Sequence, residues 1–139
     1  MQLTPYLFFD GRCEEALEFY KKALGAEAIL LMRFKDSPEP PPPGQMPTGS
    51  ENKVMHATVR IGDVEFMASD GHCGGNPSFS GFSLSLTLPN EAKVNQAFAA
   101  LSERGKVDMP LAKTFFSPRF GMLTDRFGVR WMLTVPIQT

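Results

Sequence analysis

Several short segments of the chain alternate between hydrophobic and polar positions, and two longer segments show helical spacing instead. Apolar residues three and four apart predict helices at 13–24 and 90–104, with Gly25 and Gly105 where each helix should end. Alternation predicts strands at 3–9, 26–34, 54–61, 64–70, 82–88, 106–115, 120–124 and 129–135. The pattern therefore predicts an α+β fold in which a strand-helix-strand-strand-strand unit, βαβββ, occurs twice.

Two sequence offsets relate equivalent positions in the two halves of the chain. Gly25 and Gly105 are 80 positions apart, whereas Val64-Glu65-Phe66-Met67 and Val129-Arg130-Trp131-Met132 are 65 apart. The difference is about the length of segment 36–52, which holds six of the twelve prolines and cannot pair inside a sheet. We expect a single domain with module one at about 3–70, a mobile proline-rich insertion at 36–52, and module two at about 81–136.

Composition narrows the class of protein. The 139 residues include 14 Lys+Arg and 15 Asp+Glu, which give a net charge of −1. This charge lacks the basic excess that is typical of proteins that bind nucleic acid or an anionic membrane. No apolar run approaches the roughly 18 residues of a membrane span, and the first residues lack the features of a signal peptide. Two cysteines make no disulfide framework. We expect a soluble, reduced, cytoplasmic protein.

Alternation also assigns the two faces of each strand. Phe66 and Trp131 belong to the apolar set that must lie under the helices. The opposite face carries mixed residues, and the side chains of Pro5, Leu7, Met67 and Met132 suggest that it forms a pocket, because these apolar groups gain nothing from open water.

Three segments carry a family resemblance: PYLFFDGRCEEALEFYKKALGAE, HATVRIGDVEFMASD and RFGMLTDRFGVRWML. They resemble the PhnB-like branch of the glyoxalase/bleomycin-resistance (vicinal oxygen chelate) superfamily nearly end to end. The most specific part contains Asp125, Phe127, Gly128 and Trp131. The resemblance implies two tandem βαβββ modules that form a curved sheet around one cleft, and commonly a homodimer.

The same resemblance implies four metal-ligand positions, on the first and last strand of each module. Carried through the two registers, they fall on Pro5, Met67, Ser85 and Met132. None is a histidine or a carboxylate, and one serine with two thioethers does not supply the ligands that a divalent metal needs. We therefore expect no metal and no other cofactor.

His56 and Glu65 are the candidate catalytic residues. His56 is the one histidine on the pocket face and can act as a general base or bind a ligand oxygen. Glu65 and Arg130 are repeat equivalents that can clamp a polar ligand or pair with each other or solvent. The candidate ligand-binding residues are Thr58, Met67, Ser83, Ser85, Arg130 and Met132.

The sequence supports thiol catalysis, zinc binding and methyl transfer less well than a site at His56 and Glu65. Cys73 follows His72, but adjacent side chains do not point at each other, and the cysteines and histidines match no zinc spacing. A ubiquinone-pathway methyltransferase, a common label in this branch, needs a helix after a glycine-rich turn, and GHCGGN leads into a strand instead. Phe115, Phe116 and Phe120 can wall the cleft or make a dimer contact, and the sequence does not separate the two.

Three hypotheses follow. The first is a metal-independent protein that binds an unknown small molecule. The second is an isomerase- or lyase-like enzyme that uses His56 and Glu65 for proton transfer. The third is a structural homodimer without a ligand. In all three the partners include neither nucleic acid nor membrane.

Overall fold

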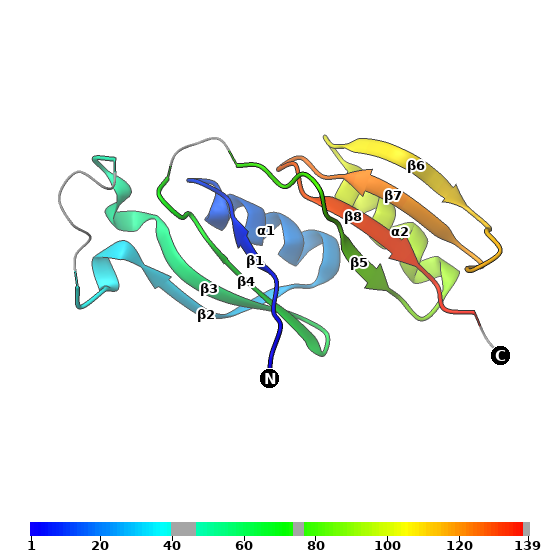
Figure 1. Ribbon diagram of the computed structural model, residues 1–139, viewed down its shortest axis with the longest axis horizontal. Helices are drawn as coiled ribbons and strands as arrows, with labels where there is room; N and C mark the ends of the chain where they lie inside the picture. The colour runs from blue at the N-terminus through cyan, green and yellow to red at the C-terminus, as the bar shows by residue number, and fades with distance from the viewer. Residues whose placement is uncertain (40–46, 74–76, 138–139) are drawn as a thin grey trace. The chain divides into compact units, whose positions relative to one another are not determined.

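The computed structural model describes residues 1–39, 47–73 and 77–137, which form two compact units, Met1–Pro77 and Ser78–Thr139. Each unit contains one four-stranded sheet and one α-helix, and we call them module one and module two (Figure 1). The predicted α+β fold with two βαβββ modules is confirmed.

Module one has the sheet order β1-β4-β3-β2, with β1 parallel to β4 and the other neighbours antiparallel. Helix α1 packs on one face of this sheet (Figure 1). Two short 3₁₀ helices, η1 (Phe34–Asp36) and η2 (Ser50–Asn52), fall at the ends of the proline-rich segment. The main elements are β1 (Tyr6–Phe8), α1 (Cys13–Leu24), β2 (Glu27–Arg33), β3 (Val54–Ile61) and β4 (Val64–Ser69).

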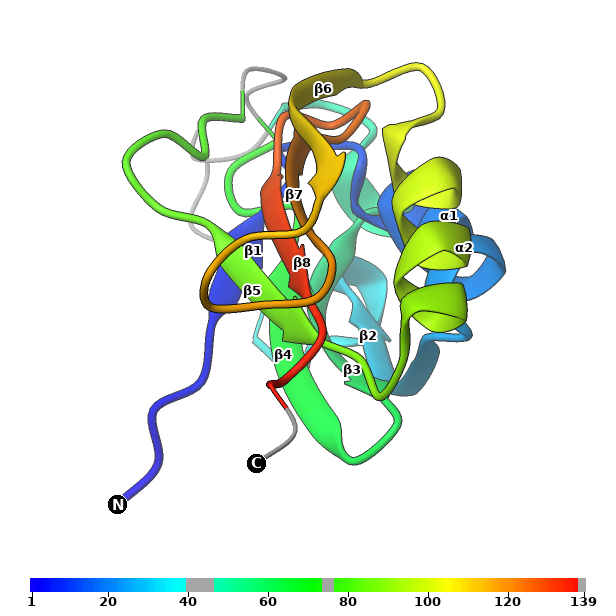
Figure 2. The ribbon, with the colours of Figure 1, turned by 90° about the vertical axis from the view of Figure 1, so that its right-hand side faces the viewer.

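Module two repeats this topology as β5-β8-β7-β6, again with the first strand parallel to the last. Helix α2 covers one face of its sheet (Figure 2). The elements are β5 (Leu84–Thr87), α2 (Glu91–Ser102), β6 (Lys106–Ala112), β7 (Phe120–Thr124) and β8 (Arg130–Thr134). The predicted strand at 82–88 starts later, and Phe82 is exposed rather than in the core.

The two helices end differently. Gly25 takes the left-handed conformation after α1, as the sequence predicts, and its N–H bonds back into the helix. Gly105 does not cap α2: Glu103 is the C-cap and Arg104 has the positive φ of 61°. Gly105 is required for space, because a Cβ there would lie 2.3 Å from the carbonyl oxygen of Thr124. The expected equivalence of Gly25 and Gly105 is therefore wrong.

Burial gives the true helix register. The buried residues of α1 recur in α2 with the same spacing, each 81 positions later. They are Cys13, Ala16, Leu17 and Tyr20 in α1, and Val94, Ala97, Phe98 and Leu101 in α2.

The core lies between each helix and the inward face of its sheet. Phe66 and Trp131 are buried there, as expected. Leu7, expected on the opposite face, is also in this core and only 1% exposed. Its neighbour Phe9 has the same orientation and contacts the ring of Tyr20 on α1. On the first strand the sequence-based assignment of faces was therefore wrong, because a strand this short has too few alternations to define it.

Two buried carboxylates join loops to strands. Asp70, directly after β4, accepts hydrogen bonds from the backbone N–H groups of Gly11, Cys13 and Val54 at 2.7–2.8 Å. It thereby ties the start of α1 and the start of β3 to the end of β4. Asp125 accepts from the backbone of Phe127 and Val129 and from the indole of Trp131. Each carboxylate satisfies several otherwise unpaired donors.

Two further expectations concern the surface. Part of the proline-rich insertion, residues 40–46, lies outside the described residues, so its expected mobility stays a prediction. Within the described part of the chain, neither helix is long and apolar enough to cross a bilayer.

Candidate functional site

The face of module one opposite α1 carries three cross-strand rows of side chains. The central row runs across all four strands through Tyr6, Met67, Thr58 and Leu30. Beside it His56 pairs with Met32, and on its other side Arg60 pairs with both Glu65 and Glu27. Because residues two apart along a strand share a face, these rows form one continuous surface.

A hydrogen-bonded chain crosses this surface. The hydroxyl of Tyr6 lies 3.1 Å from Nδ1 of His56, and Oγ1 of Thr58 lies 3.4 Å from Nε2. The Tyr6 ring also contacts the His56 ring and the Phe8 ring, with centroids 5.6 and 4.9 Å away. The structure thus brings His56 and Thr58 together, and it adds Tyr6, which the sequence reasoning missed.

Tyr6 was missed because the register of the first strand was off by one residue. Tyr6 pairs with Met67, just as Ser85 pairs with Met132 in module two. Tyr6, and not Pro5, is therefore the counterpart of Ser85. Pro5 contributes its carbonyl, which accepts a hydrogen bond from the N–H of Met67. The strand pairing is the signal that locates Tyr6, and only the tertiary structure contains it.

Glu65 lies apart from His56. Its carboxylate pairs with Arg60 at 3.3 Å, and both side chains are nearly half exposed. Arg60 is four residues along β3 from His56, a distance of about 13 Å at about 3.3 Å per residue. The structure therefore does not bring the two predicted catalytic residues into contact.

In module two the equivalent face is dominated by methionine. Ser85, Met132, Met122 and Met109 form one row across its four strands. Thioether side chains are flexible and polarisable, so such a row adapts to apolar ligands of different shape. Of the other predicted binding residues, Arg130 is exposed and pairs with Thr124, and Ser83 lies just before β5.

The donor set does not fit the metal that the superfamily resemblance implies. The positions in question hold a phenol and a thioether in module one, and a hydroxyl and a thioether in module two. Zinc, iron and manganese favour imidazole, carboxylate or thiolate ligands, which these four residues do not provide. Within residues 1–39, 47–73 and 77–137, no three His, Cys, Asp or Glu residues gather as a metal-binding group.

The two cysteines are poor nucleophiles. Cys13 is fully buried, and this burial, reinforced by the negative charge of Asp70, raises the pKa of its thiol. Burial also raises the pKa of the half-buried Cys73. Neither environment favours the reactive thiolate.

The chain shares its fold with proteins of the glyoxalase/bleomycin-resistance class. A member of the glyoxalase/bleomycin resistance protein/dioxygenase superfamily from Sphaerobacter thermophilus has the same fold, with a TM-score of 0.58, 20% identity, and coverage of 97% of this chain and 98% of that one.

Sequence comparison also shows the family to which the chain belongs. A family model described as 3-demethylubiquinone-9 3-methyltransferase matches residues 1–134, and the chain belongs to that family. Protein YjdN of Escherichia coli is 38% identical over 143 residues, covering 97% of this chain and 95% of YjdN. The predicted resemblance to the PhnB-like branch is confirmed.

Two solved structures support the same assignment. Protein PA1353 from Pseudomonas aeruginosa has a TM-score of 0.83 and 40% identity, with 98% of both chains covered. A PhnB protein from Bacillus cereus has a TM-score of 0.78 and 31% identity, with 97% of this chain and 99% of that chain covered.

Proposed function

We propose that this protein binds a small organic molecule without a metal, on the face of module one that carries Tyr6 and His56. The observation that carries the proposal is the contact of 3.1 Å between the Tyr6 hydroxyl and Nδ1 of His56. Both side chains are half buried, so the polar atoms are partly shielded from water but still accessible to a ligand.

The chemistry of this pair defines the ligand. When the Tyr6 hydroxyl donates to Nδ1, the proton of the neutral imidazole sits on Nε2. Thr58 is a distant partner for Nε2 at 3.4 Å, so a ligand oxygen can take its place. Phe8, Met32 and Met67 surround the pair with apolar surface. We therefore expect a largely apolar molecule with a carbonyl or hydroxyl oxygen.

A ligand-observed NMR screen of a fragment library, with metal analysis of the same purified protein, tests the proposal. Fragments that contain a carbonyl should bind wild type, and both Tyr6→Phe and His56→Ala should weaken that binding. His72→Ala is the matched control, because His72 is the other histidine and is exposed. Stoichiometric zinc, nickel, manganese or iron would overturn the metal-free part. Binding that survives both site variants would overturn the assignment to this face.

The enzymatic alternative finds less support. Proton transfer by His56 and Glu65 together needs both groups within reach of one substrate atom, and Glu65 instead pairs with Arg60. A methyltransferase activity also finds less support, because residues 70–73 and 77–83, which are described between β4 and β5, contain no helix to receive a methyl donor. Titration with S-adenosylmethionine should accordingly give no heat of binding.

The proposal extends to a homodimer. Phe115 is 96% exposed, and its ring contacts Phe116, which in turn contacts Phe120, so an aromatic cluster reaches the surface. Exposed apolar clusters of this kind favour self-association. Sedimentation velocity should show a dimer that Phe115→Ser weakens, and a monomeric wild-type protein would overturn this part.

A further inference from the structure

Three rings lie in contact on the face of module one that carries the Tyr6–His56 pair. The Tyr6 ring is the middle one, with its centroid 4.9 Å from that of Phe8 and 5.6 Å from that of His56. We propose that the ligand of this face is a planar aromatic carbonyl compound, whose ring packs on Phe8 and Tyr6. This inference rests on the proposed function, since it names the class of molecule that the pair binds.

Phe8 is the ring that remains open to solvent. It is 52% exposed and shares its face with Tyr6, because the two residues are two apart on β1. An apolar ring is therefore available directly beside the hydroxyl and the imidazole. A ligand that covers this ring removes apolar surface from water, which favours binding.

Gly71 restricts the orientation of the Phe8 ring. An added Cβ at Gly71 would lie 3.1 Å from Cδ1 of Phe8 and 3.2 Å from Oδ1 of Asp10. Gly71 also has a φ of 55°, in the left-handed region that favours glycine. The backbone after β4 thus approaches the ring closely from one side, while Tyr6 contacts it as well. A ring that is held in place before the ligand arrives costs less to order on binding.

The sheet itself does not require aromatic residues at these positions. In module two, Ser85 and Thr87 pair with β8 as Tyr6 and Phe8 pair with β4. The same parallel pairing therefore forms with two small hydroxyl side chains. The adjacent rings on β1 are a property of the ligand face of module one, and not of the fold.

The rings and the imidazole together favour a carbonyl that is attached directly to an aromatic ring. Conjugation keeps such a molecule planar, so its ring can pack on Phe8 and Tyr6 while its oxygen accepts a hydrogen bond from Nε2 of His56. Stacked or edge-to-face ring pairs strengthen binding by about threefold to tenfold beyond the effect of buried area. A saturated ring of the same size lacks this contribution.

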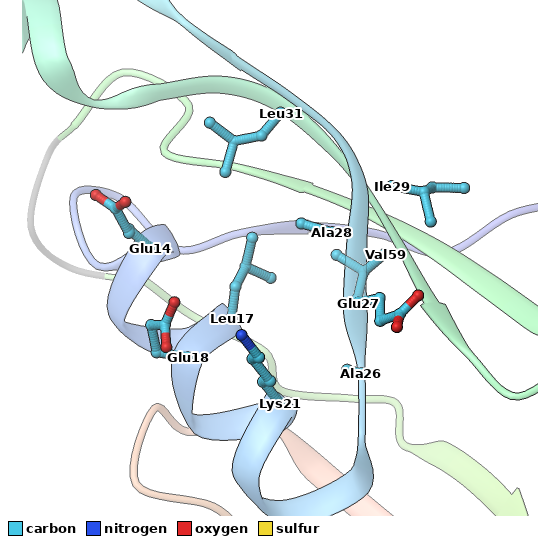
Figure 3. A pocket seen from close by; sticks show the side chains of 10 residues that line it. All are labelled: Glu14, Leu17, Glu18, Lys21, Ala26, Glu27, Ala28, Ile29, Leu31 and Val59. Carbon is cyan, nitrogen blue, oxygen red and sulfur yellow. The ribbon is translucent and has the colours of Figure 1, made fainter.

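The groove between α1 and β2, on the other face of the sheet, is the alternative location for an apolar probe (Figure 3). Its described lining combines apolar and charged side chains, Leu17, Leu31 and Glu27 among them, and includes no aromatic residue. A probe that bound there would show no preference for an aromatic ring and no dependence on Phe8. The two locations are therefore distinguishable.

Acetophenone and cyclohexyl methyl ketone are the probes, because they share the carbonyl group and differ in the ring. Ligand-observed NMR titrations of the full chain should show that wild type binds acetophenone about threefold to tenfold more tightly. Phe8→Thr, which copies Thr87 of module two, should remove this preference, and Phe8→Tyr should keep it. Phe82→Thr is the matched control at a residue that is 47% exposed, and it should change neither affinity.

The outcomes separate this inference from the proposed function. Equal affinity of wild type for the two ketones, or a preference that persists in Phe8→Thr, would overturn the aromatic class. If Tyr6→Phe and His56→Ala then still weaken the binding of both ketones, the proposed function stands. Binding of both ketones that survives Tyr6→Phe and His56→Ala would overturn the proposed function, and this inference with it.

Discussion

Tyr6 and His56 are 50 positions apart in the chain, yet the Tyr6 hydroxyl lies 3.1 Å from Nδ1 of His56. The two residues come from β1 and β3, which do not pair with each other but both pair with β4. The contact therefore depends on the parallel pairing of β1 with β4. This strand order sets a phenol beside an imidazole on the face that we propose binds a ligand.

Removal of the Tyr6 hydroxyl should change the His56 ring directly. Tyr6→Phe should shift the ¹⁵N resonance of Nδ1 and lower the free energy of unfolding by about 0.5–1.5 kcal/mol, the usual net value of one hydrogen bond. Long-range ¹H–¹⁵N spectra and urea unfolding measure these effects. Thr58→Val, whose hydroxyl is the more distant partner, should alter the Nε2 signal less. An unchanged Nδ1 resonance in Tyr6→Phe would contradict the contact.

Asp70 should be among the most sensitive positions of module one. In Asp70→Asn one carboxylate oxygen becomes an amide that cannot accept, and a backbone N–H of Gly11, Cys13 or Val54 is left facing a donor. We expect a loss of about 2–4 kcal/mol in unfolding free energy, measured by urea denaturation. Asp125→Asn should behave alike in module two. Asp63→Asn makes the same chemical change at an exposed turn and should cost little; equal losses at Asp63 and Asp70 would refute the argument.

Gly105 and Gly25 should respond differently to alanine. At Gly25 an added Cβ meets nothing within 4 Å, so Gly25→Ala costs only the left-handed conformation, about 1–2 kcal/mol. At Gly105 the Cβ would meet the Thr124 carbonyl at 2.3 Å, and the backbone must move. Gly105→Ala should therefore lower the urea midpoint more than Gly25→Ala. The reverse order would show that Gly105 acts as an ordinary helix cap.

Cys13 should make stability depend on alkaline pH. Burial raises the pKa of its thiol in the folded state, with a further contribution from Asp70. The free energy of unfolding is therefore unaffected by Cys13 below the unfolded thiol pKa of about 8.5. Above that pH the unfolded thiol loses its proton while the buried thiol keeps it, so the free energy of unfolding declines as pH rises. Cys13→Ala should flatten this decline, as measured by urea unfolding between neutral and alkaline pH.

Thiol labelling separates the two cysteines in the same samples. Ellman's reagent should modify the half-buried Cys73 in the native protein and reach Cys13 only on unfolding. Rapid native labelling of Cys13 would contradict its burial.

The sequence by itself determined the element order and most of the core. Helical spacing located α1 to the residue, and alternation oriented β3, β4 and β8, because these strands are long enough to show which positions repeat. The internal repeat was also readable, since Met67 and Met132 do occupy equivalent positions in the two sheets. Family membership followed from three motifs, each made up of residues that are neighbours in the chain.

Only the tertiary structure decided what depends on contacts between distant segments. The three-residue strand β1 has no reliable pattern of its own, and its pairing with β4 placed Tyr6, rather than Pro5, beside Met67. The separation of Glu65 from His56 is likewise a matter of register along β3. No pattern of neighbouring residues in the sequence predicts these features, because each depends on how one strand pairs or packs against another.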